Sequence, residues 1–192
     1  KVIAQESIKA LGSQDWCGVV QLDGQTGRDD WLWTKPTGMA RVGPNRDTML
    51  NKVGRMTPGD MPDFNPSMVM AAAAFARLPD AAVKHMIIIS DGDPIPPSQA
   101  TLNALIKAGA KVTTVAVGCH QAAGNNELKN IATQTGGTYY VVNNPKTLPR
   151  IYQREVRKVT KPLVYERDTG FSPYITYDHE ILRGVGGVKD SA

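Results

Sequence analysis

The 192-residue sequence is poor in cysteine, histidine and aromatic residues, and each shortage narrows the possible functions. It has two cysteines, three histidines and 6% aromatic residues. Cys17 and Cys119 lie far apart and outside any metal-type spacing, so we expect two buried free thiols rather than a disulfide. The scattered histidines, His85, His120 and His179, do not make a zinc site.

Long apolar runs and nucleotide-binding motifs are also missing. No stretch approaches the ~18 apolar residues that a helix needs to cross a bilayer. No strand is followed by G-x-G-x-x-G, and G-x-x-x-x-G-K-[ST] is absent, which argues against a dinucleotide or P-loop site. Ser90 lies outside a G-x-S-x-G elbow, so a serine-hydrolase triad is disfavoured.

The net charge of +4 is concentrated between residues 146 and 167, where seven basic residues accompany two acidic ones. A solvated helix face is the simpler interpretation, and a docking surface for an acidic partner or for phosphate groups is the alternative. No nucleic-acid-binding motif accompanies the charge. We therefore expect no nucleic-acid partner.

Helical and strand patterns alternate along residues 1–160. Apolar spacing predicts helices near residues 1–12, 46–56, 65–78, 98–109, 125–136 and 146–159, and strands near 16–22, 31–34, 86–91, 112–117 and 138–142. Short connections between such elements favour an α/β fold, with a doubly wound, mostly parallel sheet and helices on both faces. Residues 161–192 lose the pattern and are interpreted as a C-terminal linker or an arm that packs on a partner chain.

Local signals refine these elements. Residues 42–45 are expected to form a loop, and Asn65 is expected to cap the helix that follows it. Helical spacing places Val69 and Ile106 on the buried sides of their helices. The unbroken run from Met86 to Ile89 predicts a strand buried on both faces.

Acidic residues lie where the predicted sheet would bind a ligand. Asp91 and Asp93 follow the isoleucine-rich strand, and Asp63 lies in the loop before the preceding helix. Ligands of open α/β sheets bind beyond the carboxyl ends of the strands. Oxygen ligands of this kind suit a hard divalent cation such as Mg²⁺. The alternative is that these carboxylates cap turns and helices.

The segment Met86-Ile-Ile-Ile-Ser-Asp-Gly92 resembles the third metal-site motif of the von Willebrand factor A (VWA) domain, which has a Rossmann-like fold. The Thr135-Gly-Gly-Thr-Tyr-Tyr140 element and the basic last helix also resemble this family. The resemblance places Asp63 where the family has a threonine, and implies a metal site of Asp63, Asp91 and Asp93, with Ser67 as a weaker ligand.

The resemblance also implies a first central strand carrying D-x-S-x-S before the first helix. The sequence begins within that helix, so this strand is expected to be missing and the MIDAS-like site to be incomplete. We expect a strand-like piece of the tail, Leu163–Tyr165 or Tyr174–Tyr177, to fill the gap. Exchange of this arm between two chains would give a homodimer.

The expected function is a non-enzymatic protein-interaction module that binds a partner, through an acidic side chain of that partner if Mg²⁺ is held. More narrowly, the run from Gly59 to Glu155 resembles bacterial membrane-associated proteins in which an A domain precedes a glutamine-amidotransferase-like domain. The first alternative is therefore a regulatory domain of a larger amidotransferase-like enzyme. The second is a metal-dependent hydrolase that uses Asp63, Asp91 and Asp93, but this inventory of ligands is thin.

Overall fold

The computed structural model of the chain describes residues 2–23, 27–34, 37–57, 61–92, 94–118, 122–143 and 147–159. Residues 1–160 form one compact unit. Predictions that concern Asp93, Cys119, His120 and residues 161–192 lie outside the described residues. No helix among the described residues is long and apolar enough to cross a membrane.

Six helices and seven strands make up the described part of this unit. The helices are α1 (Val2–Ala10), α2 (Val42–Arg55), α3 (Asn65–Ala76), α4 (Gln99–Lys107), α5 (Ala122–Gln134) and α6 (Leu148–Val159). The strands are β1 (Trp16–Cys17), β2 (Val20–Asp23), β3 (Arg28–Trp31), β4 (Ala40–Arg41), β5 (Lys84–Ser90), β6 (Ala110–Val117) and β7 (Tyr139–Val142).

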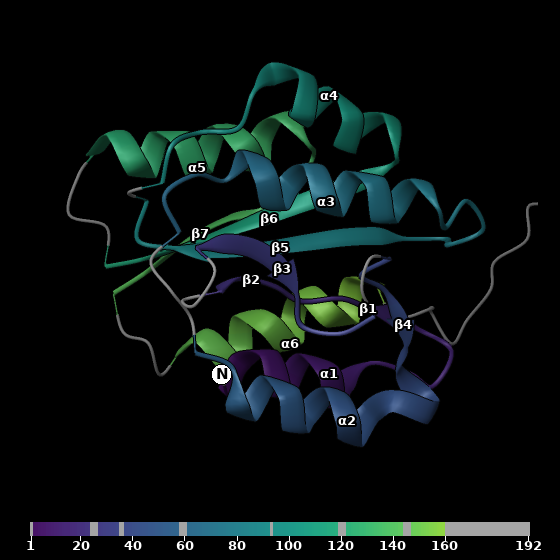
Figure 1. The fold of residues 1–192 in the computed structure, drawn as a ribbon. Helices are drawn as coiled ribbons and strands as arrows, with labels where there is room; N and C mark the ends of the chain where they lie inside the picture. The colour runs from purple at the N-terminus through teal and green to yellow at the C-terminus, as the bar shows by residue number, and fades with distance from the viewer. Residues whose placement is uncertain are drawn as a thin grey trace, which may run out of the picture. The chain divides into compact units, whose positions relative to one another are not determined.

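The centre of the unit is a parallel sheet with the strand order β5–β6–β7. Helices α3, α4 and α5 cover one face of this sheet, while α1 and α6 cover the other and α2 lies beside α1 (Figure 1). Two small antiparallel pairs, β1–β4 and β2–β3, form separate sheets. The predicted doubly wound, Rossmann-like α/β fold is confirmed.

Strand β6 supplies the core with side chains on both faces, because successive residues of a strand point to opposite sides. Val112 and Ala116 join the cluster formed with α3, α4 and α5. Val115, with Val117 packed beside it, belongs to the cluster that includes Leu148 of α6. The sheet is therefore sandwiched between two apolar layers.

A buried carboxylate fastens α6 to all three parallel strands. Glu155 is fully buried, and accepts hydrogen bonds from Thr113 Oγ1 on β6 at 2.8 Å and from Tyr140 OH on β7 at 2.7 Å. His85 Nε2 on β5 lies 3.3 Å from its Oε2. A buried carboxylate is tolerated only when several partners compensate for its lost hydration, and these side chains supply them.

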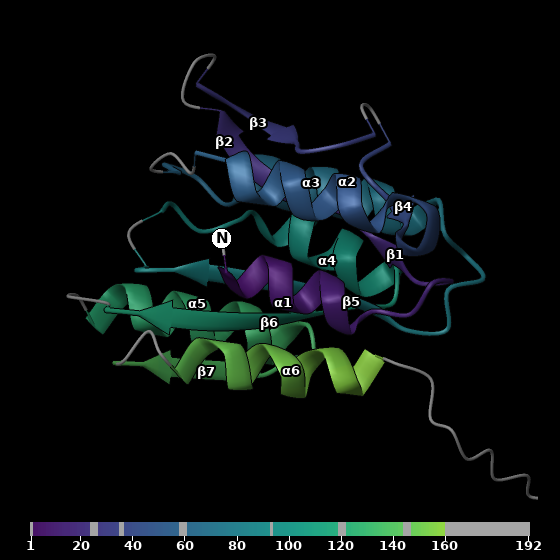
Figure 2. The same ribbon diagram turned by 90° about the horizontal axis from the view of Figure 1, so that it is seen from below.

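Strand β5 is less buried than its sequence predicts. Among the described residues it has a strand partner, β6, on one edge only, and the β2–β3 hairpin lies on its far side (Figure 2). Ile88 is 8% exposed, but Ile89 is 44% exposed. The expectation of a strand buried on both faces holds at Ile88 but not at Ile89, because among the described residues β5 has a neighbouring strand on one edge rather than two.

Two further boundaries differ from the sequence-based expectation. Helix α2 already begins at Val42, because Pro44 falls in its first turn, where a missing N–H costs nothing. Gly43 fits there because a Cβ would lie 2.8 Å from Ser13 O. The strand predicted at 31–34 is β3, which ends at Trp31, and Thr34 adopts a positive φ of 56° that strands do not allow.

Candidate functional site

Asp91 directly follows β5 at the carboxyl end of the parallel sheet, where ligands of open α/β sheets bind. The residue is exposed. Gly92 turns the chain with a φ of +90°, a conformation that favours glycine. Ser90 Oγ accepts a hydrogen bond from Gly92 N at 3.0 Å and donates one to Asp91 Oδ1 at 3.4 Å. The turn thus presents the Asp91 carboxylate to solvent.

The loop that carries Asp63 runs beside the segment that follows β5. Phe64 N donates to Ile95 O at 3.0 Å, and Ile95 N donates to Pro62 O at 2.9 Å. These two bonds form an isolated parallel bridge between Asp63 and Ile95. The chain segments bearing Asp63 and Asp91 therefore meet at the same end of the sheet.

Two carboxylates lie at the N-terminus of α3. Asp63 Oδ1 accepts the backbone N–H of Asn65 at 2.7 Å, and Asp29, from β3, lies close enough to Asp63 and Ser67 for both to act on the pKa of its carboxyl group. Pro66 between them has no N–H. The positive end of the helix dipole favours negative charge at this place. Capping, which the sequence offered as the alternative to metal binding, is thus a role that Asp63 fills.

The surroundings of Asp29 destabilise the ionised form of its carboxyl group. Burial raises the pKa of its carboxyl group, the nearby negative charge of Asp63 raises it further, and the hydrogen bonds from Ser67 oppose both effects. Its Oδ2 atom is buried and has no hydrogen-bond partner among the described residues. Protonation of this oxygen, or a cation beside it, would offset the cost of the buried negative charge.

Sequence reasoning did not find Asp29, because β3 reaches the start of α3 only through the tertiary fold. The one available signal was the pair Asp29-Asp30, since strands are depleted in aspartate. Ser67, predicted as a weaker ligand, is 6% exposed, and its hydroxyl also lies 3.1 Å from Phe64 O as a donor. The Ser67 hydroxyl is thus already engaged, since Met61 Sδ also lies 3.6 Å from it.

Asn65 links the beginnings of α3 and α4. Phe64, not Asn65 as predicted, occupies the N-cap position of α3. The Oδ1 atom of Asn65 accepts hydrogen bonds from Ser98 N at 3.0 Å and from Thr101 Oγ1 at 2.6 Å. Ser98 caps α4 as predicted, since its side chain accepts from Thr101 N. Asn65 is therefore used between helices rather than within its own.

The site offers oxygen donors only. Within the described ranges, no three His, Cys, Asp or Glu residues come close enough together to hold a metal ion. Carboxylate and hydroxyl oxygens suit Mg²⁺ in kind, and the unpartnered Oδ2 of Asp29 is an acceptor that a cation would satisfy. The number of oxygen atoms available to ligate a metal ion is small, because Asp63 and Ser67 are already hydrogen-bonded.

The family model of the von Willebrand factor type A domain matches residues 37–154, which include Asp63, Ser67 and Asp91. The chain belongs to this family. VWA domains are generally non-enzymatic modules that mediate protein–protein interaction, and they often bind a divalent metal ion. No curated protein matches the chain.

The fold is also similar to that of a solved structure. The chain is similar to the von Willebrand factor type A structure from Catenulispora acidiphila, with a TM-score of 0.66 and 20% identity. That match covers 82% of this chain but 36% of the other, so the chain spans about a third of its length. The conserved hypothetical protein BatB from Bacteroides thetaiotaomicron matches with a TM-score of 0.49 and 13% identity, covering 84% of this chain and 86% of that chain.

Proposed function

We propose that this VWA domain is a non-enzymatic protein-interaction module whose metal site is degenerate. The observation that supports this most directly is the capping of α3 by Asp63, whose carboxylate already accepts a backbone N–H of the helix. A carboxylate that accepts a short backbone hydrogen bond has fewer lone pairs left for a cation. Recognition would then depend on the protein surface more than on a tightly held ion.

Mg²⁺ binding, where it occurs, would be weak and would use Asp63 and Asp91, with Asp93 as a third ligand. These hard oxygen donors fit the ion in kind, and Mg²⁺ keeps several waters when few carboxylates are available. An ion with open positions supplies a ligand site for an acidic side chain of a partner. Asp29, absent from the sequence-based ligand set, adds negative charge beside Asp63 and supports retention of the cation.

The test is calorimetric titration of the whole chain with Mg²⁺ and Mn²⁺, beside the variants Asp63→Asn and Asp91→Asn. We expect weak heats that disappear in Asp91→Asn, with Asp80→Asn, an exposed loop carboxylate, as the matched control. Tight binding that survives both substitutions would contradict a degenerate site. Turnover of phosphate esters by the purified chain, lost in Asp91→Asn, would overturn the non-enzymatic role in favour of the hydrolase.

The finer context is also proposed: the domain regulates or serves a larger, membrane-associated protein with an amidotransferase-like part. Its support is the resemblance of the run from Gly59 to Glu155 to such proteins. A partner captured with the full chain, identified and then titrated as a purified protein, tests the interaction role. Failure of every captured candidate to bind when purified would contradict that role.

A homodimer formed through residues 161–192 is a related proposal. The support is that β5 has a strand partner on one edge only among the described residues, and an open edge of this kind attracts another strand. Light scattering of the full chain and of a chain ending at Thr160 tests it. Equal monomer masses for the two forms would refute the dimer.

A further inference from the structure

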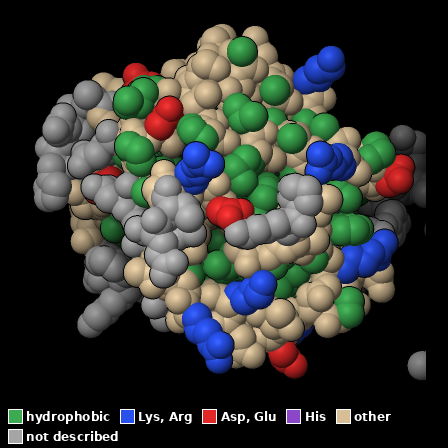
Figure 3. Space-filling view, in the orientation of Figure 1, with side chains coloured by type: hydrophobic (Ala, Val, Ile, Leu, Met, Phe, Trp, Pro, Cys, Tyr) green, Lys and Arg blue, Asp and Glu red, His purple; other side chains and the backbone are tan. Residues whose placement is uncertain are grey.

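Helix α3 lacks the polar outer side that a surface helix ordinarily carries. No charged residue occurs from Asn65 to Ala76. The outer side is nevertheless uncovered: Val69 is 48% exposed, and Ala73 and Ala76 are also exposed. In the space-filling view, hydrophobic side chains gather on this face between lysine and arginine side chains (Figure 3). Apolar surface of this kind marks a place where another molecule docks.

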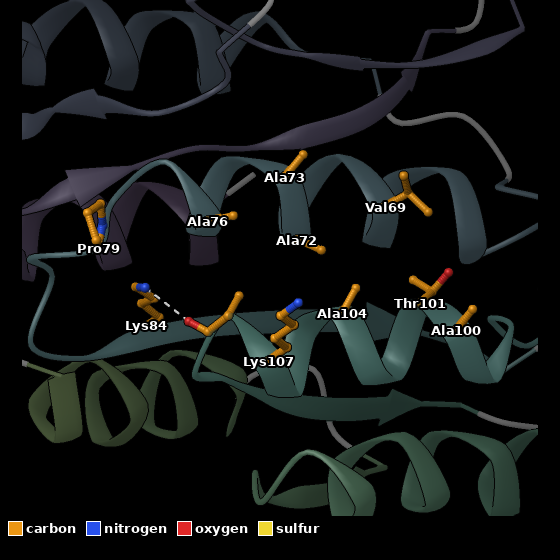
Figure 4. A pocket seen from close by; sticks show the side chains of 11 residues that line it. Val69, Ala72, Ala73, Ala76, Pro79, Lys84, Ala100, Thr101, Ala104 and Lys107 are labelled. Carbon is orange, nitrogen blue, oxygen red and sulfur yellow. Dashed lines mark hydrogen bonds between the residues drawn. The ribbon is translucent and has the colours of Figure 1, made fainter.

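A groove of about 820 Å³ runs between α3 and α4 on this face. Ala72 of α3 and Ala104 of α4 point toward each other across it (Figure 4). Its lining is dominated by alanines of both helices and is completed by a few larger side chains, among them Val69, Lys84 and Lys107. The exposed Ile106 (46%), predicted to be buried, belongs to the same helix as the second wall.

The shape of the groove suits a helix. The α3 wall from Val69 to Ala76 is about 10 Å long at 1.5 Å per residue, which matches two turns of a helix laid alongside. Alanine walls let a third helix approach to the short end of the 8–10 Å range seen between packed helices. Two turns present three apolar side chains at i, i+4 and i+7, the anchors of helix-in-groove recognition.

The positive charge of the groove indicates which type of side chain a bound ligand carries and at which end. Lys84 and Lys107 line it, and none of its described lining residues is Asp or Glu. Lys84 Nζ donates to Ala108 O at 3.0 Å, which holds this ammonium group where α4 ends. A ligand carboxylate that lies at the lysine end of the groove would be attracted by two cations, whereas a basic residue of the ligand at that end would be repelled.

We infer that the groove between α3 and α4 docks an amphipathic helix of a partner protein, with aliphatic side chains on the alanines and an Asp or Glu at the lysine end. The inference rests on the proposed interaction role and names the surface and the class of partner. It places the contact along the helices, away from the carboxylates at the end of the sheet. Loss of Asp91 should therefore leave this binding unchanged.

The test selects binders from a displayed library of helical peptides against the whole chain. Selected sequences should share aliphatic residues at i, i+4 and i+7 and an acidic residue near one end. A synthetic peptide of that sequence should shift the NMR signals of ¹³C-labelled alanine methyls at positions 72, 73, 76, 100 and 104. Ala73→Arg and Ala104→Arg, both at exposed positions, should weaken binding at least tenfold, while Ala10→Arg, at an exposed position at the end of α1, serves as the matched control.

The lysines are tested by a double exchange. Lys84→Gln with Lys107→Gln should weaken the acidic peptide several-fold, yet leave its Glu→Gln analogue nearly unaffected. Circular dichroism of each variant verifies the fold, and the exposed Lys107→Gln alone is the second variant should the double one unfold. Equal losses for both peptides would overturn the assignment of the acidic end.

Other outcomes would overturn the inference while leaving the interaction role to its own tests. Peptides that bind without moving the groove methyls would place recognition elsewhere, and a library that yields no helix would remove the stated class of partner. Methyl shifts produced by phosphatidylglycerol vesicles alone would assign the groove to a lipid surface. Shifts that grow with protein concentration, without peptide, would assign it to a second copy of the chain.

Discussion

At the scale of single residues, Asp29 makes the clearest pH-dependent contribution. Burial raises the pKa of its carboxyl group in the folded state, and Asp63 adds to the effect. The folded protein therefore binds this proton more tightly than the unfolded chain does. The stabilisation is fully present below the unfolded pKa and is lost as the pH rises through the raised folded pKa.

Asp29→Asn should consequently flatten the stability curve on the acid side and leave the protein at least as stable as wild type at neutral pH. The neutral amide no longer repels Asp63. Urea unfolding between about pH 3 and pH 7 measures this difference. Asp80→Asn is the control, and the same slope in wild type and Asp29→Asn would contradict the assignment.

Cys17 is a free cysteine whose reactivity its surroundings suppress. Burial raises the pKa of the thiol to about 12, so almost no thiolate forms at pH 8. In a Cys119→Ser background, a disulfide reagent should react with Cys17 slowly in the folded protein and rapidly in urea. Equally fast labelling in both states would show that the thiol is accessible.

At the scale of helices and strands, Glu155 is the contact with the largest expected effect. Glu155→Ala removes the acceptor of two hydrogen bonds and leaves Thr113, Tyr140 and His85 without their shared carboxylate. We expect a loss of about 3–5 kcal/mol in the free energy of unfolding, and a smaller loss for Glu155→Gln. Urea unfolding measures both, and the exposed neighbour Gln153→Ala should change little.

Helix α5 supports the acidic turn after β5 through a glycine contact. A Cβ on Gly124 would lie 2.4 Å from Gly92 O, so Gly124→Ala must push the Asp91–Gly92 turn aside. We expect lower stability and displaced amide NMR signals at Asp91 and Gly92. Gly54→Ala, at a helical glycine whose Cβ would meet only the side-chain end of Gln5 at 3.3 Å, is the matched control. Unmoved turn signals would show that the packing adjusts elsewhere.

Elements with purely local signals could be predicted from the sequence. Strand β6 and the Ser98 cap of α4 follow from apolar runs and capping chemistry within a few residues. The strand expected at 31–34 was misplaced because an aromatic residue there is buried although it belongs to a loop. Trp33, which follows the end of β3, is the example. Helical spacing also misjudged Val69, because a helix that is apolar all round gives no indication of which side faces outward.

The candidate site was predictable in part, for a physical reason. Asp91 and Asp63 stand beside strong strand and helix signals, so their neighbourhoods could be inferred from the rule for parallel sheets. Asp29 reaches the start of α3 through tertiary packing of a hairpin, which no local pattern encodes. The ligand set of Asp63, Asp91 and Asp93 remains a prediction, since Asp93 lies outside the described residues.

For the molecule as a whole, residues 1–160 should carry the cooperative fold. They form a compact unit of their own with apolar clusters on both faces of the sheet. A chain that ends at Thr160 should unfold in urea within about 1 kcal/mol of the full chain. Loss of cooperative unfolding in the shorter chain would show that residues 161–192 complete the fold.

The groove between α3 and α4 is pinned at both ends. Asn65 joins the starts of the two helices, and Lys84 binds the carbonyl of Ala108 where α4 finishes. The groove is therefore preorganised, and little of the binding free energy is lost in rearranging it when a ligand binds. The association rate constant should be about 10⁵–10⁷ M⁻¹ s⁻¹, as for rigid docking. Differences in affinity between competing ligands should lie in their dissociation rate constants.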